Sequence, residues 1–569
     1  MATVPPNAEV AAQFELLADL LELAGDEGGF RVGAYRRAAA RVRESAAPVA
    51  QLALEGRAKE LSGIGKTIEG KIVEIVRDGE MRALTKHKAL VPPEVVLFMR
   101  VPGLGPKTAR RIWQELGIST LEELREAAAG ERLRTLPGLG AKTEERVRSA
   151  LLTEARAEPV RPLLGAGLPA LTAVVSVLRE HPLVDLVSEA GSVRRRKETF
   201  RDLDIIATSG DPAGLTQYFT SLRWVVEVAA WGETKATVVS NDGLRFDLRV
   251  VPPESYGNLL QHFTGSKEHN VALREDAVKR GLSVSEYGVQ TVESGEVFRT
   301  RSEVELYEYL GYQYIAPELR ENAGELEAAR RGELPALVEL GDLRGDLHAH
   351  STWSNDGKST IEEMAVAARD RGYEYLALTD HSHYLREGRL ARQWEEIQAV
   401  NDRLAPFRVL RGIEVNIRAD GSLDVSDDDL AACDWVVASL HSAFDRNPTE
   451  RVLAVMDNPS VDCIGHLTGR KINRRAPADI DLSRVIERAL ATGTFLEINS
   501  QPDRLDLRDF HARVAGEAGV KIAVTSDGHR TDALSFVELG IGQARRAWLT
   551  KEQVLNTRGW HELERMRKP

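Results

Sequence analysis

Histidines and carboxylates recur in the last third of the chain at spacings that suit a metal centre. His348 and His350 are separated by one residue, and Asp527 and His529 are spaced in the same way. Because side chains two apart in a strand lie on one face, each pair would present both groups to a common site. Mixed imidazole and carboxylate ligands suit Zn²⁺, Mn²⁺ or Fe²⁺ better than Mg²⁺. The candidate ligands are His348, His350, Asp356, His381, Glu414, His441, His466, Asp527 and His529.

Apolar runs that alternate with helical patterns carry these ligands. After Gly345 this alternation predicts an α/β barrel or a layered α/β domain. Most candidate ligands follow the ends of predicted strands, and such ends converge at one mouth of a barrel. Nine ligands are more than one metal ion can bind, so the site would hold several ions, and Glu414 could bridge two of them. The predicted strands are Tyr375–Leu378, Val409–Ile413, Trp435–Ser439, Cys463–Gly465, Phe495–Ile498 and Ile522–Thr525.

A second carboxylate cluster is predicted in the middle of the chain. Asp202 and Asp204 begin an apolar strand and share a face, and Asp247 lies in another strand. Such hard oxygen ligands suit Mg²⁺, and two ions can stabilise the attacking and leaving oxygens of phosphoryl transfer. Two aspartates at a strand end are also common on protein surfaces, so this pattern alone leaves both readings open. The predicted strands here are Asp202–Ala207, Trp224–Ala229, Ala236–Ser240 and Leu244–Val251.

Residues 1–150 contain three similar Gly-x-Gly segments, each followed by a lysine and a helical pattern. The glycines allow a tight turn and the close approach of another backbone, and the next helix begins with free N–H groups that suit a phosphate. One such copy could be a turn between packed helices, but three copies with trailing lysines favour DNA binding. They contain Gly63 and Gly65, Gly103 and Gly105, and Gly138 and Gly140, followed by Lys66, Lys107 and Lys142.

Three motifs in the first 318 residues resemble parts of family X DNA polymerases, in the expected order from about residue 10. The Gly-x-Gly segments resemble the helix-hairpin-helix motif, which grips the DNA backbone without reading its sequence. The run Gly191-Ser192-Val193-Arg194-Arg195 resembles the triphosphate-holding segment of the nucleotidyltransferase palm. The run Phe263-Thr264-Gly265-Ser266, followed by Asn270 and Arg274, resembles the thumb signature of the family.

This resemblance implies the roles of individual residues. Asp202, Asp204 and Asp247 would bind two catalytic metals, Mg²⁺ or Mn²⁺. The nucleotide would be held by Ser192, Arg195, Phe263, Gly265, Asn270 and Arg274, of which the last two would contact the nascent base pair. Three positions depart from the family: Arg196 and Arg201 replace glycines, and His262 replaces the tyrosine of a Tyr-Phe pair that helps exclude the ribose 2′-hydroxyl. The sequence therefore leaves open how these three substitutions affect nucleotide binding and the discrimination between deoxyribose and ribose.

Residues 1–85 resemble the small N-terminal domain in which some relatives form a Schiff base with an abasic sugar. The corresponding lysine is Lys71, and Arg31 and Tyr35 stand where relatives contact the 5′-phosphate. A Schiff-base lysine must be partly neutral, which requires desolvation or cationic neighbours. A lyase role and a simple phosphate-binding or solvated lysine both remain open.

The histidine and carboxylate array resembles the PHP (polymerase and histidinol phosphatase) domain, which carries a three-metal phosphoesterase site. All nine positions of that pattern are filled. The usual Ser-Asp-Gly is Ser354-Asn355-Asp356-Gly357 here, which leaves Asp356 as the expected ligand. The resemblance implies three divalent metals (Zn²⁺, Mn²⁺ or Fe²⁺) that hydrolyse a phosphate ester.

Composition sets broad limits. The chain has 569 residues, a length that suggests roughly three to five domains. Only Cys433 and Cys463 are present, which fits a reducing cytosol. We find no signal peptide and no apolar run of about 18 residues, so we expect a cytoplasmic protein without membrane contact. The net charge of −12 does not exclude nucleic acid, because phosphate contacts need only local positive charge.

These observations predict a multidomain protein with helical N-terminal domains that carry helix-hairpin-helix motifs, an α+β nucleotidyltransferase palm and thumb, and a C-terminal distorted α/β barrel of PHP type. The predicted domains are 1–85 (DNA-binding or lyase-like), 86–155 (fingers), 156–255 (palm), 256–318 (thumb), 319–342 (a helical linker) and 343–569 (PHP).

The predicted function is a monomeric DNA-repair polymerase that binds gapped or nicked DNA, adds dNTPs at short gaps and carries 3′–5′ exonuclease or phosphodiesterase activity in base-excision or end repair. One alternative is a DNA-binding PHP nuclease whose palm is weak or degraded. The substituted Arg196, Arg201 and His262 favour this alternative, and the intact Asp202, Asp204 and Asp247 argue against it. Another is a PHP scaffold without catalysis, which the complete ligand set argues against.

Overall fold

The computed structural model describes residues 5, 7–25, 30–45, 49–61, 64–99, 101, 104–153 and 161–568. The chain divides into two compact units, Met1–Val160 with Asp481–Ser483, and Arg161–Ile480 with Arg484–Pro569. Among the described residues, no helix is long and apolar enough to cross a membrane.

The first unit is helical, and its core is built from the apolar faces of short helices, with Phe14, Leu17 and Phe98 fully buried. Two of the glycine segments lead directly into a helix, because Gly65 is the N-cap of α4 and Gly105 is the N-cap of α7. The helices are α1 (Asn7–Ala24), α2 (Phe30–Glu44), α3 (Val49–Leu54), α4 (Lys66–Asp78), α5 (Arg82–Lys88), α6 (Val95–Phe98), α7 (Pro106–Leu116), α8 (Leu121–Ala129) and α9 (Ala141–Thr153).

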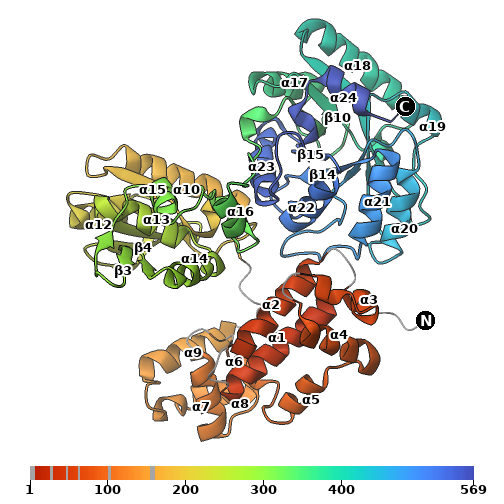
Figure 1. Cartoon of the computed structure of the whole chain (residues 1–569). Coiled ribbons are helices and arrows are strands. Elements are labelled where there is room, and N and C mark those ends of the chain that lie inside the picture. The colour runs from red at the N-terminus through yellow and green to blue at the C-terminus, as the bar shows by residue number, and fades with distance from the viewer. Residues whose placement is uncertain are drawn as a thin grey trace. The chain divides into compact units, whose positions relative to one another are not determined.

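A mixed sheet with the strand order β1-β2-β5-β4-β3 forms the palm at the start of the second unit (Figure 1). Strands β2 and β5 are parallel neighbours, whereas the other pairs are antiparallel. The elements are α10 (Leu164–Arg179), β1 (Leu186–Glu189), α11 (Gly191–Arg194), β2 (Leu203–Thr208), α12 (Pro212–Thr220), β3 (Val225–Trp231), β4 (Lys235–Ser240) and β5 (Arg245–Val251).

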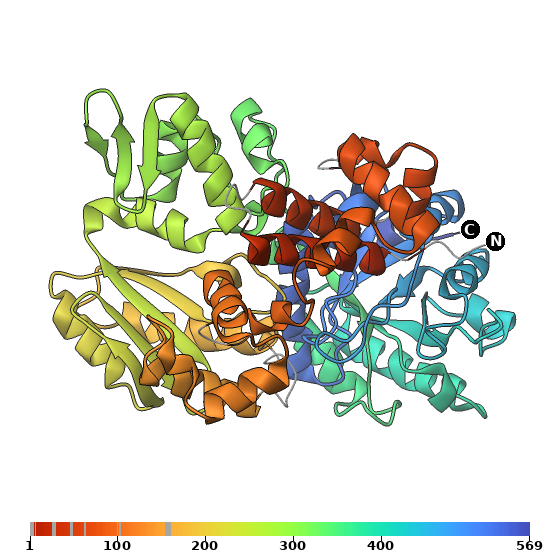
Figure 2. The same ribbon diagram turned by 90° about the horizontal axis from the view of Figure 1, so that it is seen from below.

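The thumb combines helices with a small antiparallel sheet in the order β6-β7-β8 (yellow-green in Figure 2). The stretch 318–342, predicted as a helical linker, instead contains one two-turn α-helix, α16, and short 3₁₀ turns. Leu326 and Ala329 of α16 are buried in the thumb core, so this stretch packs as part of the thumb. The elements are α13 (Tyr256–Thr264), α14 (Lys267–Lys279), β6 (Leu282–Ser285), β7 (Gly288–Thr291), β8 (Val297–Phe298), α15 (Glu303–Tyr309) and α16 (Glu325–Arg331).

The C-terminal domain is a parallel sheet in the order β15-β14-β13-β12-β11-β10-β9, with helices around it (Figure 1). A parallel bridge between Ala349 and Gly528 joins the two outer strands, so the sheet is nearly closed into a barrel. The strands are buried on both faces, which explains their nearly continuous apolar sequences. This architecture, together with the helical first unit and the α+β palm and thumb, confirms the predicted fold class.

The strands of this barrel are β9 (Gly345–Ala349), β10 (Tyr375–Leu378), β11 (Arg408–Asn416), β12 (Trp435–Ser439), β13 (Cys463–Gly465), β14 (Phe495–Asn499) and β15 (Ile522–Thr525). Its helices are α17 (Ile361–Asp370), α18 (Arg389–Leu404), α19 (Asp427–Ala431), α20 (Pro448–Met456), α21 (Leu482–Thr492), α22 (Asp509–Ala518), α23 (Val537–Arg546) and α24 (Trp560–Met566).

Candidate active sites

Glu414, near the end of β11, lies at the centre of the histidine and carboxylate cluster. Its Oε2 atom is 2.7 Å from Nδ1 of His381. Its Oε1 atom is 3.3 Å from Nε2 of His441 and 3.1 Å from Nε2 of His466. One carboxylate therefore faces imidazoles that follow three other strands, as a bridging ligand would.

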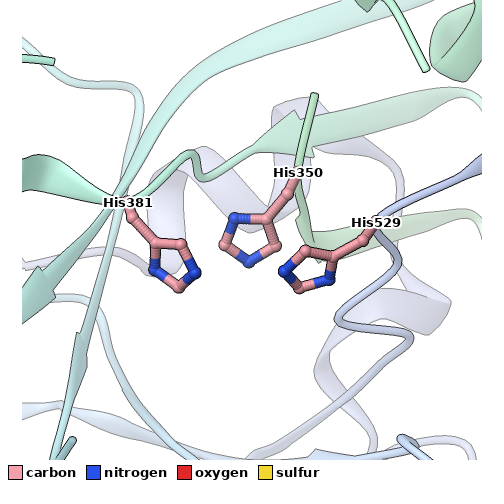
Figure 3. Close-up of side chains that lie close together, drawn as sticks. All are labelled: His350, His381 and His529. Atoms are coloured by element: carbon pink, nitrogen blue, oxygen red, sulfur yellow. The ribbon is translucent and has the colours of Figure 1, made fainter. Parts of the chain in front are cut away.

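A second part of the cluster surrounds His350, which follows β9. Its Nε2 atom is 3.2 Å from Oδ1 of Asp527. Oδ2 of Asp356 is 3.3 Å from Nε2 of His381 and 3.4 Å from Nε2 of His529. Figure 3 shows the rings of His350, His381 and His529 side by side, and the His350 ring centroid is 4.4 Å from that of His381 and 4.2 Å from that of His529. The structure thus brings Asp356 into the cluster despite the inserted Asn355.

The donor atoms of this cluster fit divalent metal ions. Each of three sets of donor atoms lies within 4.8 Å: those of His350, His381 and His529, of His348, His350 and Glu414, and of His381, Glu414 and His441. Nε2 of His348, both ring nitrogens of His350 and Nδ1 of His466 are buried without a hydrogen-bond partner among the described residues. Buried nitrogens of this kind normally have a partner, which a metal ion would supply here.

Burial and neighbouring charges shift the pKa values of two histidines in the cluster in opposite directions. Burial, followed by the nearby His529 and His381, lowers the pKa of His350 to about 3, so its ring is neutral and can donate a lone pair. Burial lowers the pKa of His381, but the carboxylates of Glu414 and Asp356 outweigh burial and raise it to about 10. A proton held by His381 therefore stands where a cation would bind between two carboxylates.

Residues outside the predicted set orient the ligands. Glu497 of β14 accepts a hydrogen bond from Nδ1 of His348 at 2.6 Å and another from the backbone N–H of His466 at 2.6 Å. Asn416 Oδ1 lies 2.7 Å from Nδ1 of His441. The signal that could have revealed Glu497 is a single carboxylate inside the apolar run Phe495–Ile498, because a buried charge needs a partner.

A cavity of about 720 Å³, here called the PHP cavity, opens onto this cluster. Seven of the predicted ligands line it, and four cationic side chains surround them. These are Lys358, Lys471, Arg504 and Arg530. Metal ligands with cations around them form a site suited to a phosphate ester.

The palm brings its three predicted carboxylates together. Asp204 on β2 and Asp247 on β5 are direct partners in the parallel register, and Asp202 immediately precedes β2. Burial, followed by the charges of Asp247 and Asp202, raises the pKa of Asp204 to about 7. A Cβ atom at Gly191 would lie 2.0 Å from Oδ2 of Asp204, so only glycine fits beside this carboxylate. Three carboxylates that repel one another fit divalent cations.

A cavity of about 770 Å³, here called the palm cavity, contains both Asp202 and Asp204. All six residues predicted to hold the nucleotide line it. They are Ser192, Arg195, Phe263, Gly265, Asn270 and Arg274. The structure therefore places the predicted metal ligands and nucleotide contacts in one cavity, although Asp247 itself is outside its lining.

Several of these side chains are held by neighbours. Arg195 forms an ion pair with Glu321 at 2.9 Å and donates to the carbonyl of Thr264. Asn270 donates to the carbonyl of His262 at 2.8 Å. The substituted His262 is thus part of the frame that orients a predicted base-pair contact, and its Nδ1 atom also lies 3.0 Å from Nη2 of Arg274.

The two arginines that replace family glycines have different environments. Arg196 has φ of +57°, a backbone conformation that favours glycine, and its side chain packs against α23, where a Cβ at Gly542 would lie 3.0 Å from its own Cβ. Arg201 is exposed, and its Nε atom is 3.1 Å from Oδ2 of Asp202. Arg196 therefore contacts the C-terminal domain, whereas Arg201 competes for a predicted metal ligand.

In the first unit, the described hairpin glycines face open space. A Cβ atom at Gly65, Gly105, Gly138 or Gly140 would meet no atom within 4 Å among the described residues. Gly63 and Gly103, also predicted to contact DNA, lie outside the described residues. The glycines therefore leave room for the close approach of another backbone, which fits the predicted contact with DNA.

The predicted lyase residues lie on neighbouring helices. Nζ of Lys71 on α4 is 5.7 Å from the ring centroid of Tyr35 on α2. Tyr35 in turn stacks on Phe14 with a centroid distance of 6.1 Å. Arg31 is exposed on α2. The structure thus brings the lysine and the tyrosine together.

Comparisons with known protein families agree with this division of the chain. Residues 5–81 match the helix-hairpin-helix domain and residues 95–151 the SAM-like helix-hairpin-helix tandem. Residues 259–321 match the DNA polymerase beta thumb, and residues 346–501 match the PHP domain. Asp527 and His529 lie beyond the last match, but the structure places them in the same cluster.

Relatives are found for the whole chain and for its last third. A protein described as DNA polymerase/3′-5′ exonuclease PolX from Bacillus subtilis (strain 168) is 38% identical over 567 residues, covering 98% of each chain. A probable phosphatase of Thermoanaerobacter sp. (strain X514) is 31% identical over 226 residues, 37% of this chain and 89% of its own. A probable phosphatase of Acetivibrio thermocellus is 29% identical over 221 residues, 37% of this chain and 86% of its own.

The carboxylate palm, the thumb and the barrel with its ligand cluster define a nucleotidyltransferase joined to a metal-dependent phosphoesterase domain. The chain belongs to the bacterial family X DNA polymerases that carry a C-terminal PHP domain, which confirms the resemblance seen in its motifs.

Proposed function

We propose that this protein fills short gaps in DNA at the palm and trims 3′ ends by hydrolysis at the PHP site, in base-excision or end repair. The observation that carries the proposal is the presence of two separate ligand clusters, each complete and each opening into its own cavity. The full-length relative is described as a polymerase and a 3′-5′ exonuclease, which supports both activities here.

At the palm, Asp202, Asp204 and Asp247 would hold two Mg²⁺ or Mn²⁺ ions, which when bound stabilise the attacking and leaving oxygens of the transfer. Ser192 and Arg195 would bind the triphosphate of the incoming dNTP. The other cavity residues would orient its base and sugar; they are Phe263, Gly265, Asn270 and Arg274.

At the PHP site, the nine clustered side chains would hold three divalent ions (Zn²⁺, Mn²⁺ or Fe²⁺), which when bound supply the Lewis acid for phosphodiester hydrolysis. Lys358, Lys471, Arg504 and Arg530 would hold the DNA phosphates at the same cavity. Glu497 keeps His348 and His466 in position.

The remaining assignments complete this proposal. The domains would be 1–85, 86–155, 156–255, 256–318 and 343–569, with the stretch 319–342 as part of the thumb and with the glycine hairpins on gapped or nicked DNA. The protein would act as a monomer in the cytoplasm, where its two buried free cysteines stay reduced.

The palm is tested by primer extension on a one-nucleotide gap. The wild type is expected to add the complementary dNTP in the presence of Mg²⁺ or Mn²⁺, and Asp202→Ala is expected to lose this activity. Asp242→Asn is the matched control, since Asp242 is an exposed carboxylate in the turn between β4 and β5. A wild type that shows no metal-dependent extension would overturn the polymerase assignment.

The PHP site is tested by metal analysis of the purified protein together with degradation of a 5′-labelled primer. The wild type is expected to retain divalent metal and to shorten the primer from its 3′ end, whereas His350→Ala loses both. The control is His561→Ala, because His561 is exposed on α24. Equal metal content and equal degradation in wild type and His350→Ala would contradict the assignment and favour a scaffold.

A weak palm is the second candidate function, because Arg201 contacts a carboxylate that the metals need. In that case the protein is mainly a DNA-binding PHP nuclease. The Arg201→Gly variant distinguishes the two. Under this second reading it extends primers far faster than the wild type, whereas similar rates favour an active polymerase.

We also propose that Lys71 forms a Schiff base with an abasic sugar. Its neighbour Tyr35 and the exposed Arg31 supply a phosphate-binding surface on α2. Borohydride should trap a covalent complex between the wild type and abasic DNA but not with Lys71→Arg. Trapping of equal amounts with both proteins, or with neither, would reject this role.

A further inference from the structure

Two loops of the PHP domain run from the PHP cavity toward the palm cavity. The first loop, 469–477, follows β13, and the second loop, 501–509, follows β14. In the second loop, residues 501–504 line the PHP cavity, whereas residues 508 and 509 line the palm cavity. A single segment therefore borders both cavities.

A third cavity of about 470 Å³ lies along the first loop and shares lining residues with each of the other two. It shares Glu198 and Thr199 with the palm cavity, and it shares Lys471 with the PHP cavity. The three cavities therefore form a series of neighbours from the palm carboxylates to the PHP ligands.

Both loops are anchored in the palm. Leu505 is fully buried in the hydrophobic core of the palm, and Ile472 packs against the same core. The N–H group of Ile472 donates to the carbonyl of Asp503 at 2.7 Å, which ties the loops together. Arg470 also forms an ion pair with Glu198 of the palm at 2.7 Å. The path between the cavities is thus a fixed surface.

The surface of this path is cationic. We call it the basic bridge and define it by Arg470, Lys471, Arg474, Arg475, Arg504 and Arg508. The first loop contains no acidic residue. Of the acidic residues of the second loop, Asp503 pairs with Lys471 of the bridge, whereas Asp509 pairs with Arg546 outside it, and Asp506 is buried and accepts hydrogen bonds from Thr468.

Several guanidinium nitrogens of the bridge are buried without a hydrogen bond. Nη1 of Arg504 and Nε of Arg508 have no hydrogen-bond partner in the described part of the chain, and Nε of Arg504 has only Asp527, at 3.9 Å. Arg474 is exposed and has no acidic partner among the described residues. Burial and the charge of Arg504 both lower the pKa of Lys471, which shows that the cations crowd one another. Such a cluster fits a polyanion.

Aromatic rings accompany the cations. Phe263 lines the palm cavity and Phe536 lines the PHP cavity. On the first loop, the guanidinium of Arg475, which lines the third cavity, lies 4.2 Å from the ring centroid of Phe444. Basic grooves with interspersed aromatic rings are typical of surfaces that bind single-stranded nucleic acid, because bases stack while phosphates are neutralised.

We propose that the basic bridge binds single-stranded DNA and guides an unpaired primer 3′ end from the palm cavity to the PHP cavity. This inference rests on the proposed function, because the two ends of the bridge must act on the same strand. A mismatched primer would then be trimmed and extended again within one encounter with the protein.

The test is a single-encounter assay on gapped DNA whose primer ends in a mismatched nucleotide. The protein is bound to labelled DNA without metal, and the reaction is started with Mn²⁺, dNTPs and excess heparin as a trap. The wild type should give primers that are trimmed and then extended. Arg474→Glu with Arg475→Glu should reduce these products at least about tenfold, because two phosphate contacts become repulsive.

Controls separate this effect from misfolding. The double variant should extend a matched primer at the wild-type rate. Arg371→Glu with Arg565→Glu makes the same charge change at exposed arginines outside the bridge and should retain the coupled products. The single variant Arg474→Ala removes an exposed side chain without an acidic partner and should show a smaller loss in the same direction.

Binding of a fluorescent oligothymidylate in EDTA gives a second readout. The slope of log affinity against log salt should fall by about 1.4 in the double variant, or about 0.7 for each lost phosphate contact. If polyglutamate or free dATP displaces the oligothymidylate as well as unlabelled DNA does, the bridge binds another anion and the proposal fails.

The outcomes distinguish the two levels of the account. A wild type that neither extends nor trims overturns the proposed function and the bridge with it. A wild type that performs both reactions, together with a bridge variant that yields as many coupled products, overturns the bridge alone.

Discussion

Asp204→Asn is expected to stabilise the metal-free palm while it abolishes extension. In the folded protein Asp204 has a pKa of about 7 because of its burial and because of Asp247 and Asp202. In the unfolded chain, the carboxyl group of Asp204 would have the ordinary pKa of 3.8. The folded state therefore holds a proton that the unfolded state releases, and the wild type loses stability as the pH rises from about 4 to about 7.

The size of this effect follows from the shift. A difference of about 3 pKa units corresponds to about 4 kcal/mol, accumulated at about 1.4 kcal/mol per pH unit and constant above pH 7. Asparagine is neutral at every pH and avoids this penalty. The free energy of unfolding of the variant should therefore exceed that of the wild type by about 4 kcal/mol at pH 8 and by less than about 1 kcal/mol at pH 4.

Hydrogen exchange of the backbone amides in β2 and β5, read by mass spectrometry in EDTA, measures this difference within the palm. Comparing both proteins at one pH cancels the intrinsic exchange rate. Asp242→Asn is the control and should match the wild type at both pH values. Equal protection of wild type and Asp204→Asn at pH 8, or a difference that does not shrink toward pH 4, would refute the electrostatic reasoning.

Three further predictions follow from individual contacts. Glu497→Gln should weaken metal binding at the PHP site about 10- to 100-fold, measured as metal retained on dialysis, with gap extension unchanged; full retention would count against its orienting role. Arg201→Gly should lower the Mg²⁺ concentration for half-maximal extension by up to about fivefold, because an exposed ion pair contributes at most about 1 kcal/mol, and an increase would contradict this. Glu321→Gln removes the carboxylate that pairs with Arg195, whereas the buried Arg546 keeps its ion pair with Asp509, so the variant should destabilise the protein by up to about 3 kcal/mol and raise the KM for dNTPs more than it lowers kcat; an unchanged KM would show that Arg195 needs no such support.

The sequence predicted the barrel well because its strands are short apolar runs with clear limits. Tyr375–Leu378, Trp435–Ser439 and Cys463–Gly465 coincide with β10, β12 and β13. Most ligands stand at the end of such a run, although Asp356 lies in the loop after β9, so the cluster could be predicted from local pattern and resemblance. The prediction of a helical linker over 318–342 was wrong. The Glu, Arg, Ala and Leu residues of this stretch favour helix, but Gly324 and Gly332 limit α16 to two turns.

Contacts between distant segments could not be predicted from local pattern. Arg196 looked like a defect of the palm, but its side chain packs against α23, more than three hundred residues along the chain. Glu497 was missed because the local sequence around a single carboxylate in a strand does not show that it will bind His348, which is far away along the chain. The basic bridge depends on Leu505 and Ile472 entering the palm core, which is a property of tertiary packing alone.

The central claim is that one chain carries two independent metal-dependent active sites, and one crossed experiment tests it most directly. Wild type, Asp202→Ala and His350→Ala are compared on the same gapped DNA, with extension and 3′ trimming read from the same lanes. The account predicts that Asp202→Ala trims without extending and that His350→Ala extends without trimming. Loss of both activities in either variant would contradict it.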